Sequence, residues 1–323
     1  MKLLTFRPPR MRNPHFGVLL SNGQALDLTA SSGRALPGSL VECIRAGEAG
    51  LAAVRAVHEI AEGLLARELV PDAMVSLDAV ELLAPLRPGK IMAVGRNYTD
   101  LAAAAAAADA DATVTTPAAA AAFTGVAAPL ARPGGFIKNA SCVIGPGEAI
   151  RKPRWTRKLD YETELAVVIG IDCAGVDPEQ WADVVFGYTI LNDLSARDIQ
   201  AVEQRDGNMT VGKNFPGAAP LGPWVVTKDE IPDPHALRIL TRVNGIARQD
   251  GNTGDQVHRI PAQIAWYSRA GFEAGDIVST GSPGGTAVSY KGPGSWFLEH
   301  GHTVECEIEG IGVLTNPVRN ARA

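Results

Sequence analysis

The sequence has few cysteines, few aromatic residues and no excess of basic residues. Its cysteines form no CxxC pair and lie far apart, at Cys43, Cys142, Cys173 and Cys306. This spacing argues against a disulfide framework and against a zinc ribbon. The formal net charge is −5. Because a chain with this charge balance has little attraction to a phosphate backbone, we expect no nucleic-acid partner.

Long hydrophobic runs are missing as well. Residues 1–16 lack the apolar core that a secretory signal needs. The stretch 101–123 consists mostly of alanine, which is weakly hydrophobic, and it is interrupted by Asp109, Asp111 and Pro117. We therefore expect no membrane partner and a cytoplasmic location.

Glycine (34 residues), proline (22 residues) and apolar side chains are plentiful, with 46% hydrophobic against 20% charged residues. This balance is typical of a globular protein with a large core and many turns. At about 150 residues per domain, the length predicts two units.

The pattern of predicted strands and helices changes near residue 85. Residues 1–85 combine short strands with two helical stretches, and we interpret them as a small N-terminal accessory domain. Residues 86–323 alternate short apolar strands with loops and contain few helices, which predicts a second, mainly β domain. The expected fold is mixed α+β and mainly β. Within the second unit, residues 101–135 contain 17 alanines and are predicted to be an insertion or lid.

Three carboxylates occur where strands would bring them together. Glu162 and Glu164 are two residues apart on the predicted strand 160–170, so both project from the same face. Asp193 ends a second apolar strand, 187–193. Adjacent like charges repel unless they are solvated or share a cation. With no cysteine or histidine nearby, this group favours Mg²⁺ or Mn²⁺, with Ca²⁺ as an alternative.

Each carboxylate also has a simpler interpretation. Two glutamates at this spacing can face solvent, where water compensates their charge. Asp193 can cap the helix predicted over 195–205, in which Ser195 and Asp198 resemble a capping pair. Spacing alone leaves both interpretations open.

A series of motifs extends over most of the chain. In order they are IMAVGRNY (91–98), FIKNAS (136–141), DYETELAVVIG (160–170), GYTILNDLSARDIQ (187–200), GKNF (212–215), PLGPW (220–224), VNGIARQDGNT (243–253), GDIVSTGSPGG (275–285) and EIEGIG (307–312). In order and approximate spacing, the segment from about Lys90 to Val318 resembles the fumarylacetoacetate hydrolase family. That family includes acylpyruvate hydrolases and relatives that decarboxylate or isomerise 2-oxo acids.

The resemblance implies the family's β-roll core, with residues 86–323 as the catalytic domain, and usually a homodimer. Glu162, Glu164 and Asp193 match its metal ligands, typically for Mg²⁺ or Mn²⁺. Lys213 matches the lysine that holds the substrate or the developing enolate, which makes it the predicted catalytic residue. Further residues in matched segments are predicted to contact a small carboxylic-acid substrate; these are Arg197, Gln200, Ser282, Tyr98 and Lys138.

The function that the resemblance implies first is divalent-metal-dependent hydrolysis of a C–C bond in an acylpyruvate or related 1,3-dicarbonyl acid. A metal ion would polarise the carbonyl group and stabilise the enolate that leaves. Lys213 would add positive charge where negative charge develops.

One departure from the family pattern keeps other reactions open. Hydrolytic members usually read NYxxHxxE, in which the His and Glu activate water. Leu101 and Ala104 stand at those positions. Asp109 or Asp111 could supply a base instead. Otherwise the protein is a decarboxylase, isomerase or hydratase of a similar 2-oxo acid. A third hypothesis is a non-catalytic relative that only binds ligand, although its complete carboxylate set argues against it.

Overall fold

The computed structural model describes residues 1–31, 36–98 and 131–321. Within these residues the chain forms three sheets. The largest has twelve strands, in the order β4-β3-β2-β1-β14-β12-β11-β17-β6-β7, while β5 pairs with β1 and β8 with β14. A five-stranded sheet has the order β16-β15-β18-β19-β9, and β10 pairs with β13. The predicted mixed α+β fold, dominated by strands, is confirmed.

The first 85 residues supply one end of the large sheet and three helices. The strands are β1 (Lys2–Arg7), β2 (His15–Leu19), β3 (Ala25–Asp27), β4 (Met74–Val75) and β5 (Glu81–Leu83). The α-helices are α1 (Leu28–Ser31), α2 (Leu40–Arg45) and α3 (Gly47–Leu65), and a 3₁₀ turn, η1 (Leu77–Ala79), follows them.

The remaining residues complete the large sheet and form the other two. The large sheet takes β6 (Ile91–Gly95), β7 (Gly134–Lys138), β8 (Val143–Ile144), β11 (Thr163–Ile169), β12 (Val185–Asn192), β14 (Ala219–Thr227) and β17 (Ile277–Ser279). The others contain β9 (Ile150–Lys152), β10 (Leu159–Asp160), β13 (Ser195–Ala196), β15 (Arg238–Val243), β16 (Ile246–Asn252), β18 (Thr303–Ile308) and β19 (Gly312–Asn320).

Few helices accompany these strands. The α-helices are α6 (Arg197–Arg205) and α7 (Ile260–Tyr267). The 3₁₀ turns are η2 (Ala140–Cys142), η3 (Pro178–Asp183), η4 (Lys228–Glu230), η5 (Thr253–Asp255), η6 (Ser268–Ala270) and η7 (Ala287–Ser289).

Continuous apolar runs place β11 and β12 at the centre of the large sheet. Every residue of both strands is buried, because neighbouring elements cover both faces. Their antiparallel register pairs Thr163 with Asn192. The prediction of one continuous strand over 160–170 is wrong, because this segment contributes to two different strands. Its first residues pair with β13 as β10, and the chain changes partner at Tyr161 and Glu162 before it enters β11.

The helix predicted over 195–205 begins at Arg197, because Ser195 and Ala196 pair with β10. The predicted capping pair does not form. Ser195 Oγ donates to Glu162 Oε2 at 3.0 Å, whereas Asp198 accepts hydrogen bonds from Thr156 Oγ1 and from the Arg157 amide. Ser195 thus connects β13 to Glu162, and Asp198 connects α6 to the loop between β9 and β10.

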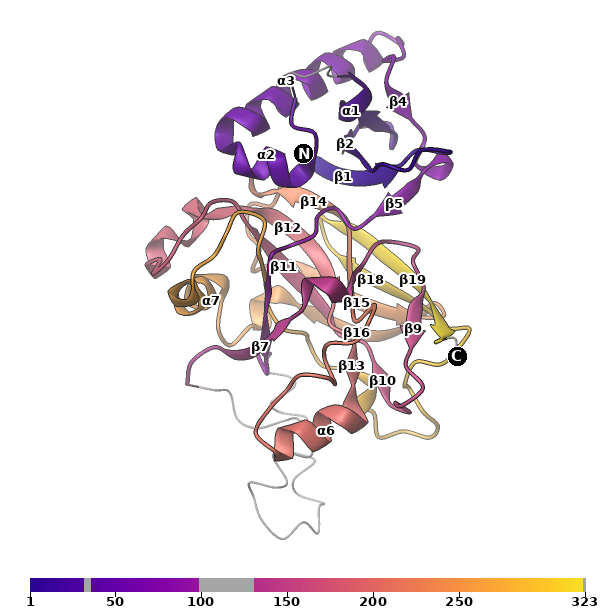
Figure 1. Ribbon diagram of the computed structural model, residues 1–323, viewed down its shortest axis with the longest axis vertical. Helices are drawn as coiled ribbons and strands as arrows, with labels where there is room; N and C mark the ends of the chain where they lie inside the picture. Colours follow the sequence, from indigo (N-terminus) through magenta and orange to yellow (C-terminus); the bar gives the residue numbers. More distant parts are fainter. Residues whose placement is uncertain (32–35, 99–130, 322–323) are drawn as a thin grey trace.

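The N-terminal part joins the rest of the chain through hydrogen bonds between strands. β1 pairs with β14, with Lys2 opposite Val226 and Leu3 opposite Val225. Figure 1 shows α2 and α3 at one end of the molecule and α6 at the other. The domain boundary near residue 85 stays a prediction. Most of the alanine-rich segment, residues 101–130, lies outside the described residues, and residues 134–135 begin β7.

Candidate metal and substrate site

Strand register brings the three predicted carboxylates together. Because Thr163 pairs with Asn192, the residues just outside that pair, Glu162 and Asp193, lie side by side. The Asp193 amide donates to the Glu162 carbonyl oxygen at 2.8 Å. Glu164 lies two residues further along, and one oxygen from each of the three carboxylates lies within 4.8 Å of the others.

None of these carboxylates lies on a solvated face. The side chains of Glu162 and Asp193 are 12% and 2% exposed. Glu164 is also buried, and its Oε2 accepts hydrogen bonds from Ser279 Oγ of β17 and from the Gly281 amide. The two simpler interpretations, a solvated pair and a helix cap, are therefore wrong.

Two lysines approach Asp193 from different segments. Lys213 Nζ donates to Asp193 Oδ2 and to Glu162 Oε2. Lys138 Nζ lies 2.8 Å from Asp193 Oδ1 and donates to the Lys213 carbonyl oxygen, and its side chain has no exposed surface. Lys138 thus lies behind Asp193, where it fixes both that carboxylate and the backbone of Lys213. Its predicted contact with substrate stays a prediction.

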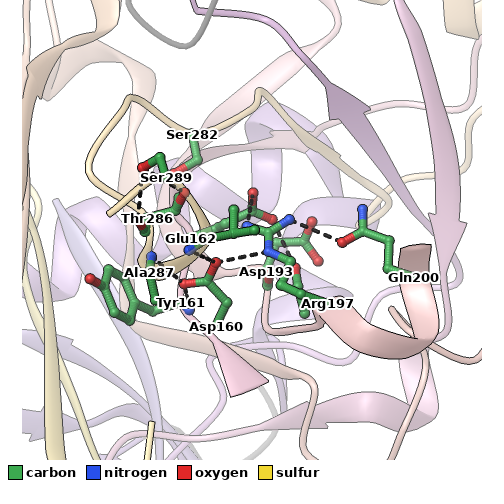
Figure 2. A network of polar contacts seen from close by, with 12 residues as sticks. Asp160, Tyr161, Glu162, Asp193, Arg197, Gln200, Ser282, Thr286, Ala287 and Ser289 are labelled. Carbon is green, nitrogen blue, oxygen red and sulfur yellow. Dashed lines mark hydrogen bonds and ion pairs between the residues drawn. The ribbon is translucent and has the colours of Figure 1, made fainter. Parts of the chain in front are cut away.

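Arg197 connects the carboxylate group to α6. Its Nε donates to Asp160 Oδ2 and its Nη2 to Glu162 Oε1, both at 2.8 Å, while its Nη1 donates to Gln200 Oε1 at 3.0 Å. Figure 2 shows the guanidinium between these partners. Asp160 also accepts the Ala287 and Val288 amides, so it ties α6 to the loop that carries Thr286 and Ser289.

The pKa values of Glu162 and Glu164 shift in opposite directions because the two side chains have different neighbours. Burial, reinforced by the nearby charges of Asp193 and Glu162, raises the pKa of Glu164 well above its usual range. Burial would also raise the pKa of Glu162, but the charges of Arg197 and Lys213 outweigh it and lower that pKa. Two of the carboxylates thus have cationic partners, whereas the partners of Glu164 are a hydroxyl and an amide.

The residues present fit a divalent cation. Three convergent carboxylates supply hard oxygen ligands. The negative charges of the three carboxylates repel one another, and burial together with this repulsion raises the pKa of Glu164. A bound divalent cation would compensate these charges. The donor set contains neither sulfur nor imidazole, as Mg²⁺ and Mn²⁺ prefer.

A cavity of about 110 Å³ opens onto these carboxylates. At roughly 30 Å³ per water molecule, it has room for a small organic acid. Its other polar lining residues are Arg96, Arg197, Gln200, Gln204, Lys213, Ser282, Thr286 and Ser289, and its apolar lining includes Val94, Phe136, Met209 and Val288. Among the described lining residues there is no histidine.

The predicted substrate residues separate into two groups. Arg197, Gln200 and Ser282 line the cavity together with Lys213. Tyr98 is buried beside Gln256, and neither it nor Lys138 lines the cavity. The predicted roles of all five stay predictions. Leu101, Ala104, Asp109 and Asp111 lie outside the described residues.

Sequence reasoning assigned no role to two residues that hold the site together. Asp160 binds Arg197, and Ser279 binds Glu164. A signal for Asp160 existed, since Asp160, Glu162 and Glu164 follow one another at a spacing of two. Ser279 carried no such signal, because only the pairing of β11 with β17 brings it to Glu164.

The described part of the chain thus combines a mainly β fold with a buried carboxylate triad, a lysine and an arginine around a small cavity. The family model described as fumarylacetoacetate (FAA) hydrolase C-terminal matches residues 90–319. The mitochondrial oxaloacetate tautomerase of Homo sapiens is 35% identical over 321 residues, which are 98% of this chain and 91% of that protein. The chain therefore belongs to the fumarylacetoacetate hydrolase family of enzymes.

Solved structures agree with this assignment. The fumarylacetoacetate hydrolase of Exiguobacterium antarcticum superposes with a TM-score of 0.73 at 30% identity, covering 99% of this chain and all of the other. The maleylpyruvate hydrolase of Sphingobium sp. SYK-6, in complex with manganese(II) and pyruvate, gives 0.71 at 27% identity with both chains fully covered. The family thus includes hydrolases and tautomerases.

Among the described residues, no helix is both long and apolar enough to cross a membrane. The human relative is named as mitochondrial. The cytoplasmic location stays a prediction.

Proposed function

We propose that the protein interconverts the keto and enol forms of a small 2-oxo dicarboxylic acid such as oxaloacetate. One observation carries the proposal. The cavity combines the carboxylate triad with Lys213, yet its described lining offers neither a histidine nor a carboxylate outside the triad. Tautomerisation needs proton transfer but no attack by water, so it does not need the His–Glu pair that Leu101 and Ala104 replace.

Glu162, Glu164 and Asp193 would hold Mg²⁺ or Mn²⁺, which when bound supplies positive charge that polarises the 2-oxo group and favours the enolate. Cationic and hydroxyl side chains of the protein would bind the substrate by donating hydrogen bonds to it. The Arg197 guanidinium has five N–H groups, of which three bind Asp160, Glu162 and Gln200. The other N–H groups and the Ser282 hydroxyl are donors for the substrate carboxylates.

Lys213 moves the proton. Conversion of the enol to the keto form adds the proton of the Lys213 ammonium to the carbon next to the enol carbon. The resulting amine takes the proton that leaves the enol oxygen, so the lysine ends as an ammonium again. Burial would lower the pKa of Lys213, but the charges of Asp193 and Glu162 outweigh it and raise that pKa, so the ammonium keeps a proton to give. Its position at the cavity wall supports this role.

Similarity supports the same choice. The human oxaloacetate tautomerase shares 35% identity with nearly the whole chain, whereas the two hydrolases described above share 30% and 27%. C–C bond hydrolysis remains the second candidate. It is favoured by the shared fold of those two hydrolases, one of which holds manganese and pyruvate.

The test follows the enol form of oxaloacetate by ultraviolet absorbance and ¹H NMR, with purified protein and Mn²⁺. We expect faster loss of the enol at constant total oxaloacetate. Lys213→Met should lower this rate about 100-fold, within the usual range for a lost proton-transfer group. The surface substitution Lys228→Met is the matched control. Release of carbon dioxide from oxaloacetate, or of two acid fragments from an acylpyruvate, would identify a decarboxylase or a hydrolase instead.

A further inference from the structure

A chain of hydrogen bonds leads from the five-stranded sheet to the substrate cavity. Its centre is Gln249 of β16, whose side chain has no exposed surface. Gln249 Oε1 accepts from the Thr163 amide at 3.1 Å and from Thr241 Oγ1 at 2.6 Å. Gln249 Nε2 donates to Ser282 Oγ and to the Pro283 carbonyl oxygen, both at 2.7 Å. All four hydrogen-bonding positions of the amide are therefore used.

The orientation of this amide is fixed by its partners. A backbone N–H group can only donate and a carbonyl oxygen can only accept. The Thr163 amide therefore requires the oxygen of Gln249 on its side, and the Pro283 carbonyl requires the nitrogen on the other. If the amide were rotated by 180°, its NH₂ group would face the Thr163 N–H group and its oxygen would face the Pro283 carbonyl oxygen. Neither pair can form a hydrogen bond.

This orientation decides what the Ser282 hydroxyl can do. A hydroxyl has one hydrogen to donate and lone pairs that accept. Because Gln249 Nε2 donates to Ser282 Oγ, the Ser282 hydrogen points to another partner. Within the described part of the chain no acceptor receives it, and Ser282 lines the cavity. The preceding residue, Gly281, binds Glu164, so this hydroxyl lies beside the carboxylate triad.

We propose that Gln249 is a positioning residue that makes Ser282 an obligate hydrogen-bond donor to a substrate carboxylate. The cavity then prefers a carboxylate to an uncharged amide at that position, because both oxygens of a carboxylate accept hydrogen bonds, whereas an amide has one accepting oxygen and an NH₂ group that only donates. The inference rests on the proposed function in one respect: the ligand is a 2-oxo acid.

The test compares pyruvate with its amide, pyruvamide, as ligands of the Mn²⁺-loaded protein, with dissociation constants from calorimetry. In Gln249→Glu, the side chain keeps its acceptor role toward Thr163 but loses the N–H group that faces Ser282, and at a pH high enough to ionise it the carboxylate accepts the Ser282 hydrogen. The serine lone pairs then face the cavity. We expect the preference for pyruvate over pyruvamide to fall about tenfold, while the affinity for Mn²⁺ measured alone stays unchanged.

The matched control repeats the substitution in a Ser282→Ala background. Since Gln249 acts through the serine hydroxyl, Gln249→Glu should not change the preference there. An equal change in both backgrounds, an unchanged preference in Gln249→Glu, or a wild-type protein that does not bind pyruvate each overturns the inference. Gln249→Met, which removes the donor without adding charge, serves if the glutamate variant does not fold, and it should lower the preference about threefold.

The two proposals fail separately. A protein that shows the Ser282-dependent change in ligand preference but does not accelerate loss of the oxaloacetate enol would overturn the proposed tautomerase activity and support the role of Gln249. The opposite result, enol conversion with no Ser282-dependent change, would overturn the role of Gln249 alone.

Discussion

At the scale of single residues, Glu164 shows the sharpest conflict between burial and charge. It lies in the sheet interior beside two other carboxylates, and its hydrogen-bond partners are Ser279 and the Gly281 amide. A buried carboxylate without a cation costs free energy, and this raises its pKa. In the absence of metal, Glu164 thus destabilises the fold in its ionised form.

Glu164→Gln tests this conflict directly. The amide has nearly the same shape and no charge, so without metal we expect the free energy of unfolding at neutral pH to rise by about 1 kcal/mol. The same variant should lose Mn²⁺ affinity at least about 100-fold, and with it the stabilisation that bound metal gives the wild type. Urea unfolding with EDTA and with Mn²⁺ measures both effects. Unchanged metal affinity would show that Glu164 is not a ligand.

Lys138 supports the site from behind, because it pairs with Asp193 and holds the Lys213 backbone. Lys138→Met removes one partner of a fully buried ion pair, and we expect a loss of about 3 kcal/mol in the free energy of unfolding. Chemical denaturation measures this loss. Lys158→Met, at an exposed position, is the control and should change stability by less than about 0.5 kcal/mol. A loss of that small size for Lys138→Met would mean that Asp193 does not depend on Lys138.

At the scale of elements, the start of α7 depends on an uncharged histidine. His235 Nε2 accepts a hydrogen bond from the Ile260 amide at 3.2 Å, and its ring packs edge-on against Trp181. Burial lowers the pKa of His235, with Arg259 adding to the effect and Asp233 opposing it. Protonation would remove the acceptor, so this end of α7 favours the neutral ring.

A pH dependence follows, and its sign is set by the lowered pKa. The unfolded chain binds a proton at His235 near pH 6.5, before the folded chain does, so acid favours unfolding. This contribution to stability is complete above pH 6.5 and is lost as the pH falls toward the folded pKa. We expect it to amount to about 1 kcal/mol. Urea unfolding between pH 7.5 and 5.5 should show a smaller loss for His235→Gln than for wild type. Equal losses would contradict this role.

At the scale of the whole molecule, residues 1–85 and the described residues after them contribute strands to one sheet. Lys2 and Leu3 of β1 pair with β14, and β14 in turn pairs with β12, which ends at the carboxylate site. Apolar residues of both parts also belong to one continuous core. Separation of the two parts would leave an edge of β14 unpaired.

We therefore expect the chain to unfold in one cooperative step. Calorimetry should show a single transition for the full chain, and deletion of residues 1–85 should yield an insoluble or unfolded protein. A folded, stable fragment 86–323, or two separate transitions, would instead establish two independent domains. The predicted homodimer is a separate question, and light scattering of the purified protein decides it.

The sequence alone identified the carboxylates, the lysine and the family. Alternation placed Glu162 and Glu164 on one face, and the apolar run before Asp193 marked a second buried strand. Motif order indicated Lys213, Arg197 and the fold. These features are local, because each depends on the order and spacing of neighbouring residues.

Only the tertiary structure determined which distant residues meet. Asp193 meets Lys138 and Ser282 meets Gln249, at separations of 55 and 33 residues along the chain. Their positions follow from strand pairing and from a change of strand partner between β10 and β11, which no local pattern records. Hydrogen-bond direction at Ser282 likewise depends on donors and acceptors supplied by separate strands. Long-range pairing therefore sets the electrostatics of the site, because the free energy of a buried polar group depends on its neighbours in space.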